Sequence, residues 1–208
     1  MASEDPEYSA GPETMAAARD EVFSYFRELE RERRAEPRED IVSALAHAEL
    51  NGEPLRRGQL DAYYLLLMVA GNETTRNLLS GGVVGLAGEP EQWRALKADP
   101  DRVPSAVEEM VRWVSPVLSM RRTATRDVEL HGKTIKAGEK VVMWFCSGNR
   151  DERVFKDPDR FLYDRSPNDH IGFGWGVHAC LGAHLARVEA RLFFQRLSER
   201  GLRVAVRG

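Results

Sequence analysis

The first third of the chain has the spacing of apolar residues that is typical of an amphipathic helix. Apolar side chains recur three and four positions apart within residues 16–34, which predicts a helix with one packed face. These positions are Val22, Phe23, Tyr25, Phe26 and Leu29. The charges of RELERERR on the same segment are expected on a solvated face. Asp40 is placed to cap a second helix over 41–50, and Asn51 with Gly52 predicts a turn that ends it.

Residues 55–86 are predicted to form one long helix. Its middle, residues 62–70, is apolar all round, so we expect that stretch to be buried on every side. The following AGNETT, residues 70–75, contains a glycine, an asparagine and two threonines, all of which lower helix propensity. Two interpretations stay open: a functional segment, or a local distortion caused by a threonine that bonds a carbonyl one turn back.

The segment SAVEEMVRW predicts a third helix, with apolar residues on one face. They are Val107, Met110, Val111 and Val114. Glu109 and Arg112 lie three positions apart beside this face, which suits an ion pair. Glu108 and Arg112, four apart, would make a surface pair equally well.

Short alternating segments follow, namely RRTAT, VEL, KTI and KVVMWF, separated by His131-Gly132 and Ala137-Gly138. Alternation with intervening turn residues predicts a small antiparallel sheet. A last helix is expected over 180–200, and GLRVAVRG forms one further strand at most. The pattern therefore predicts a mainly α fold with a small antiparallel β region, in a single domain.

Composition narrows the class of protein. Apolar residues make up 42% and charged residues 30% of 208 residues, with a formal net charge of −3, so nothing indicates a nucleic acid or a membrane surface as partner. Cys146 and Cys180 are too few for a disulfide framework, and we interpret Cys146, which follows a strand, as a small buried residue. The acidic start lacks the features of a signal peptide, and residues 62–70 are too short to cross a bilayer. We expect a cytoplasmic protein with no membrane span.

Cys180 lies between a glycine-rich segment and the last predicted helix. Glycines at 172, 174, 176 and 182 permit tight turns and close approach of a flat group. A cysteine at the start of a helix favours the thiolate that binds metals. Two other interpretations stay open: a zinc site with His178 and His184, and a free buried cysteine. A dinucleotide fingerprint is excluded, because Ala179 stands where the third glycine is required.

The stretch FGWGVHACLGAHLAR, residues 173–187, resembles the heme-binding loop of the cytochrome P-450 superfamily. That pattern is F-G-x-G-x-H-x-C-x-G followed by L-A-R, and every fixed position is matched. The resemblance implies that Cys180 is the axial iron ligand and that His178 binds a heme propionate. Phe173, Gly174 and Gly182 would line the proximal face of the porphyrin. It also implies the carboxy-terminal part of the family fold.

AGNETT resembles the distal, oxygen-binding helix of the same family. By that resemblance Ala70 and Gly71 open a groove over the iron. Glu73 and Thr74 match the acid and the alcohol that deliver protons to bound oxygen.

The third helix resembles the E-x-x-R helix of the family, in which Glu109 and Arg112 would meet a third partner, Arg160. Of two neighbouring arginines, Arg122 is the better match for a second propionate partner and Arg121 the weaker one. The resemblance also implies a substrate pocket lined by Leu66, Val69, Val117 and Leu118.

The implied function is a heme-thiolate monooxygenase that contains heme b and inserts one oxygen atom into a C–H bond. Electrons would come from NAD(P)H through ferredoxin reductase and ferredoxin. Arg187 and Arg191 would receive the carrier, unless they are only a solvated helix face. Sterols or methyl-branched lipids are the expected substrates. Family members are about twice as long, so we expect a carboxy-terminal portion, and the alternative function is a catalytically silent remnant that binds heme weakly or not at all.

Overall fold

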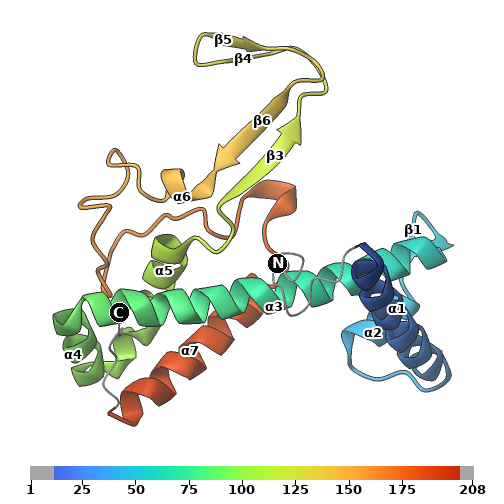
Figure 1. Ribbon diagram of the computed structural model, residues 1–208, viewed down its shortest axis with the longest axis horizontal. Coiled ribbons are helices and arrows are strands. Elements are labelled where there is room, and N and C mark those ends of the chain that lie inside the picture. Colours follow the sequence, from blue (N-terminus) through green and yellow to red (C-terminus); the bar gives the residue numbers. More distant parts are fainter. Residues whose placement is uncertain (1–11, 202–208) are drawn as a thin grey trace. The chain divides into compact units, whose positions relative to one another are not determined.

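A computed structural model describes residues 12–201 of the chain (Figure 1). The chain divides into two compact units, Met1–Asn72 and Glu73–Gly208. The expectation of a single partial domain over residues 1–208 stays a prediction. The expected final strand, GLRVAVRG, lies outside the described residues from position 202 onward.

In the first unit, two helices and a short hairpin precede a long helix. They are α1 (Pro12–Ala35), α2 (Ile41–Ala46), β1 (Glu49–Leu50) and β2 (Glu53–Pro54). The predicted cap is confirmed, because the backbone N–H of Ser43 donates to the Asp40 carboxylate at 2.7 Å. The predicted end of α2 is wrong: the helix stops at Ala46. Asn51 and Gly52, at φ of 55° and 81°, form the turn of the β1–β2 hairpin, which Asn-Gly pairs favour.

The charged run of α1 is not wholly solvated, contrary to the prediction. Glu30 is buried and accepts hydrogen bonds from Arg34 at 2.9 Å and from Arg57. The buried Asp61 accepts from Arg27 at 3.2 Å through Arg27 Nε. Arg57 and Asp61 belong to the long helix, so these ion pairs join it to α1 inside the first unit. The sequence pattern could not reveal them, because the partners are far apart in the chain.

The long helix is confirmed as α3 (Arg57–Gly88), and it continues through AGNETT. The predicted burial of its apolar middle is wrong, because the side chains of Leu66 and Val69 are 59% and 57% exposed. A helical segment that is apolar all round is expected to be covered, but its sequence does not identify the polypeptide that covers it. Within residues 12–201, none of the helices combines the length and apolarity that crossing a bilayer requires.

The second unit is built around one apolar core. It joins the end of α3 to α4 (Pro90–Ala98), α5 (Val103–Val114) and α7 (Ala183–Glu199), and the 3₁₀ turn η2 (Pro100–Arg102), which has no buried residue, connects α4 to α5. The predicted apolar face of the third helix is confirmed, since Val107, Met110 and Val111 are buried in α5. The core residues are Leu78, Leu86, Trp93, Leu96, Val103, Ala106, Val107, Met110, Val111, Phe161, Ala190 and Phe194.

The β region consists of two antiparallel ribbons. β3 (Ser119–Thr123) pairs with β6 (Lys140–Trp144), and β4 (Val128–Leu130) pairs with β5 (Lys133–Ile135). Figure 1 shows β4 and β5 at the outer end of the β3–β6 ribbon. The predicted strands are thus confirmed, although they form two ladders rather than one sheet. Cys146 lies in the short α6 (Phe145–Gly148) and is partly exposed, not buried as expected.

We predict that Phe194→Ala lowers the free energy of unfolding by about 3–5 kcal/mol, because Phe194 is fully buried among α3, α5 and α7. Leu192→Ala is the matched control on the same helix, since Leu192 is 55% exposed. Chemical denaturation of both variants measures the difference. Equal losses in the two variants would contradict this description of the core.

Candidate functional site

The backbone of residues 172–182, here called the cysteine loop, folds back on itself. The N–H of Gly174 donates to the Ile171 carbonyl at 2.8 Å, and the N–H of Cys180 donates to the Phe173 carbonyl at 2.8 Å. Between them lies a 3₁₀ turn, η3 (Gly176–His178). Gly174 and Gly176 have φ of 71° and 68°, a conformation that residues with a Cβ rarely adopt. The glycines therefore let the loop bring Cys180 back beside Phe173.

Cys180 precedes α7 and does not open it, which corrects the predicted start of that helix. α7 begins at Ala183 with Gly182 as its N-cap residue, and the Ala183 N–H donates to the Cys180 carbonyl at 3.3 Å. The cysteine is thus in the turn that leads into the helix. Its side chain is exposed, so the interpretation as a free buried cysteine is wrong.

Exposed apolar side chains flank this cysteine in the sequence. A Cβ added at Gly182 would meet no atom within 4 Å. Contiguous exposed apolar side chains usually mark a binding surface. The exposed ones here are Trp175, Val177, Leu181 and Leu185, at 89%, 98%, 82% and 61%. A thiol on a glycine-containing apolar surface fits a flat, apolar, metal-containing group such as heme. Among the described residues no three His, Cys, Asp or Glu side chains gather as a metal site, so the zinc interpretation has no support.

The other residues expected around heme lie on separate elements. Arg122 is exposed on β3 and donates to the Arg121 carbonyl at 3.0 Å, while His178 is exposed in η3. On α3, the Glu73 carboxylate pairs with Arg76 at 3.4 Å. The roles expected for Arg122, His178, Ala70, Gly71, Glu73 and Thr74 remain predictions.

The four residues expected in a substrate pocket also remain predictions. Leu66 and Val69 are exposed on α3. Leu118, just before β3, is exposed too, and its carbonyl accepts the Phe145 N–H at 2.9 Å. Val117 is half-buried.

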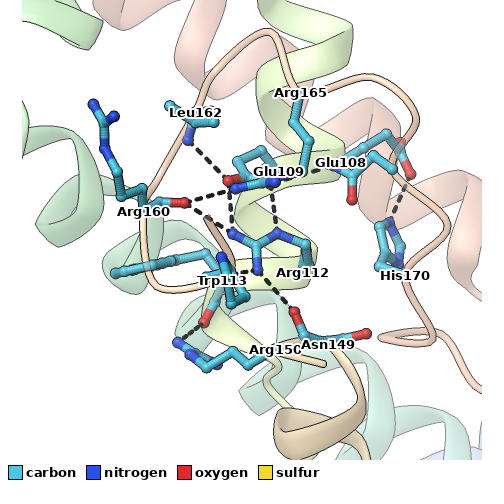
Figure 2. A network of polar contacts seen from close by, with 12 residues as sticks. Glu108, Glu109, Arg112, Trp113, Asn149, Arg150, Arg160, Leu162, Arg165 and His170 are labelled. Atoms are coloured by element: carbon cyan, nitrogen blue, oxygen red, sulfur yellow. Dashed lines mark hydrogen bonds and ion pairs between the residues drawn. The ribbon is translucent and has the colours of Figure 1, made fainter. Parts of the chain in front are cut away.

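Glu109 and Arg112 form the predicted ion pair at the centre of a buried polar network (Figure 2). Arg112 donates to the two Glu109 oxygens at 2.7 and 2.8 Å, and both side chains are fully buried. The same guanidinium donates to the carbonyls of Asn149, Pro158 and Arg160 at 2.8, 2.8 and 3.0 Å. These hydrogen bonds therefore fix the irregular segment that contains Pro158 and Arg160 against α5, although the segment and the helix are far apart in the sequence.

Arg160 contacts the Glu109–Arg112 pair as predicted, but through its backbone and not through its side chain. Arg160 contributes its backbone carbonyl, and its side chain is exposed. Arg165 supplies the second guanidinium instead, with Nε donating to Glu109 at 2.9 Å and Nη1 to the Lys156 carbonyl at 2.6 Å. Both arginines lie in one irregular segment, five positions apart, and no periodicity there indicates which side chain turns inward.

Glu108 does not pair with Arg112, so the alternative surface pair is wrong. Its carboxylate accepts two hydrogen bonds from Arg187 at 2.7 and 2.8 Å and contacts His170 at 3.1 Å. Burial raises the pKa of Glu108, but the hydrogen bonds from His170 and Arg187 outweigh it and bring the pKa to about 2. The hydrogen bond to Glu108 in turn raises the pKa of Arg187. Sequence reasoning missed this group, because its members are 62 and 79 positions from Glu108.

Comparison with known proteins agrees with this geometry. The family described as Cytochrome P450 matches residues 103–200. Linalool 8-monooxygenase of Pseudomonas putida is 46% identical over 200 residues, which are 96% of this chain and 49% of that protein. Steroid C26-monooxygenase of Mycolicibacterium smegmatis is 48% identical over 168 residues, 81% of this chain and 42% of that protein. The chain spans about half the length of the curated relatives it matches.

Solved structures lead to the same family. Cytochrome P450-153 of Novosphingobium aromaticivorans superposes with a TM-score of 0.87 at 41% identity, over 94% of this chain and 49% of that chain. Residues 103–200 therefore match the cytochrome P450 family, and the chain as a whole is similar to about half of a family member. The resemblance and the fold class expected from the sequence are both confirmed.

We predict that Arg165→Met lowers the free energy of unfolding by about 3–5 kcal/mol, because it deprives the buried Glu109 carboxylate of one of its two cationic partners. Arg160→Met should cost less than about 0.5 kcal/mol, since the Arg160 carbonyl is kept and its side chain is exposed. Urea denaturation of the two variants decides the assignment. A larger loss in Arg160→Met would restore Arg160 as the third side chain.

We predict that Glu108 contributes to the free energy of unfolding in a pH-dependent way. Its folded-state pKa of about 2 lies below the ordinary 4.5, so the carboxylate stabilises the fold above about pH 4.5 and loses this effect as the pH falls towards 2. The difference in unfolding free energy between the native chain and Glu108→Gln should therefore shrink as the pH falls through this range. Urea denaturation at several pH values measures it, with exposed Glu152→Gln as control. A difference that stays constant with pH would contradict the assignment.

Proposed function

We propose that this chain supplies the thiolate ligand and proximal surface of a heme-thiolate monooxygenase, which inserts one oxygen atom of O₂ into a C–H bond of a hydrophobic substrate. The observation that supports it best is the exposed Cys180 thiol on an open apolar loop in a chain that matches the cytochrome P450 family. Relatives named as monooxygenases support the reaction class.

The chain's own residues would hold heme b. The Cys180 sulfur would bind the iron and donate charge to it. His178 and Arg122 would donate to the two propionates, and Phe173, Gly174 and Gly182 would let the flat macrocycle approach the loop. When bound, heme supplies the activation of O₂, while the protein provides orientation and electrostatics.

On α3, Glu73 and Thr74 would hold and pass the protons that the reaction consumes. A carboxyl and a hydroxyl on adjacent residues suit a relay of this kind, and such general acid catalysis contributes about a hundredfold or more. The half-buried position of both residues supports this role. Ala70 and Gly71, with minimal side chains, would leave room above the heme.

Electrons would reach the site from NAD(P)H through ferredoxin reductase and ferredoxin, in the cytoplasm. Because Arg187 is engaged with Glu108, Arg191 is the better candidate of the two to receive an acidic carrier. Opposite charges steer such encounters, and salt weakens them.

The proposed substrate is a steroid or a branched lipid. Relatives named for a steroid and for linalool support a largely apolar molecule. Leu66, Val69, Val117 and Leu118 would contact it, because apolar side chains dominate pockets for such molecules.

We predict that the native chain, reconstituted with heme, reduced and exposed to carbon monoxide, gives the difference spectrum of a thiolate-ligated heme. Cys180→Ser should lose this signature, because a hydroxyl is a far weaker iron donor than a thiolate. Cys146→Ser is the matched control and should leave the spectrum unchanged, since Cys146 lies in α6 and outside the cysteine loop.

Three outcomes would contradict the proposal. Loss of the signature in Cys146→Ser alone would transfer the ligand to the other cysteine. An unchanged signature in Cys180→Ser would exclude Cys180 as the ligand. No heme binding by the native chain would favour the silent remnant.

A further inference from the structure

Two adjacent glutamates of α5 bind two different segments of the chain. Glu109 accepts hydrogen bonds from Arg165 and from the Leu162 N–H, both in the irregular segment before the cysteine loop. Glu108 instead contacts His170 and Arg187, on either side of that loop (Figure 2 shows its contact with His170). The contacts of Glu109 therefore fix the segment that precedes the loop. The contacts of Glu108 are placed to fix the loop itself.

The contact between Glu108 and Arg187 is bidentate. Arg187 Nε and Nη2 donate to the two carboxylate oxygens at 2.7 and 2.8 Å, and both side chains are about two-thirds buried or more. Paired bonds of this type are stronger and more directional than a single contact. Arg187 is therefore held in one orientation at the first turns of α7.

Phe173 of the cysteine loop packs against both partners of Glu108. The Arg187 guanidinium lies 4.4 Å from the centre of the Phe173 ring, and the His170 ring centre lies 5.9 Å from it. A cation over an aromatic face is attracted by the ring electrons. Phe173 in turn accepts the Cys180 N–H at 2.8 Å through its carbonyl. A continuous series of contacts thus runs from Glu108 to the backbone of Cys180.

The start of the loop is also pressed against α5. A Cβ at Gly172 would lie 2.6 Å from Val111 Cγ1 and 3.1 Å from the Val111 carbonyl, so the backbone there is in close contact with the helix. The Gly172 N–H donates to His170 Nδ1 at 3.3 Å. His170 therefore contacts Glu108 with one ring nitrogen and the loop with the other.

We propose that Glu108, His170 and Arg187 are positioning residues that hold Phe173, and through it the backbone of Cys180, in the orientation that presents the thiol. They touch neither substrate nor iron in this role. The effect on the loop is inferred from the contacts alone. Its consequence for thiolate ligation rests on the proposed function.

The geometry of Arg187 matters in this proposal, not its charge alone. A lysine at position 187 keeps a positive charge near Glu108 but loses the bidentate fork and the planar group over Phe173. Arg187→Lys should therefore behave more like Arg187→Met than like the native chain. Arg196→Met is the matched control further along α7, since the Arg196 side chain is 76% exposed.

Hydrogen exchange of the cysteine loop, followed by mass spectrometry on the chain without heme, tests the proposal. In Arg187→Met and Glu108→Gln the amides of Gly174 and Cys180 should exchange at least about tenfold faster, as expected from loss of a charged hydrogen bond. The amides of α5 should change much less. Arg196→Met should match the native chain.

Two results would overturn the proposal. Unchanged exchange of the loop in Arg187→Met would show that Phe173 is held by other contacts. An equal increase in the loop and in α5 would show that Arg187 only adds global stability.

A second readout uses heme-loaded protein. Arg187→Met and Arg187→Lys should each lower the fraction of the reduced carbon monoxide complex that keeps the thiolate signature, and an unchanged fraction in both would contradict the role in presenting the thiol. If the native chain binds no heme, the proposed function fails, and the exchange experiment still decides whether these residues position the loop.

Discussion

The fold of the second unit depends on how the carboxylate of Glu109 is paired. It is fully buried, and a charge in that position is tolerated only when oppositely charged and hydrogen-bonding partners surround it. Arg112 comes from the same helix, but Arg165 and the Leu162 N–H come from a segment more than fifty positions away. That segment has no helix or sheet of its own to place it, so these contacts determine where it runs.

This constraint explains how an irregular backbone can present a reactive side chain. The segment fixed by Glu109 leads directly to the cysteine loop, whose own turns depend on Gly174 and Gly176. Glu108, the next residue of α5, reaches His170 and Arg187 around the same loop. Two neighbouring carboxylates on one rigid helix therefore define both ends of the path that brings Cys180 to the surface.

The sequence predicted most elements but only part of the polar contacts. Periodicity located α1, α3, α5 and the four strands of the β region, because each depends on local spacing. The Glu109–Arg112 pair was predictable for the same reason. Arg165 was not, since an irregular segment has no period that indicates which side chain points inward. The exposure of Leu66 was also unpredictable, because an apolar pattern does not identify its cover.

The central claim is that the Cys180 sulfur binds heme iron, and iron X-ray absorption spectroscopy tests it most directly. The fine structure at the iron edge, measured on the native chain reconstituted with heme, distinguishes a sulfur neighbour from nitrogen and oxygen neighbours. We expect one sulfur ligand in addition to the porphyrin nitrogens. An iron with only nitrogen and oxygen ligands in the native chain would contradict the claim.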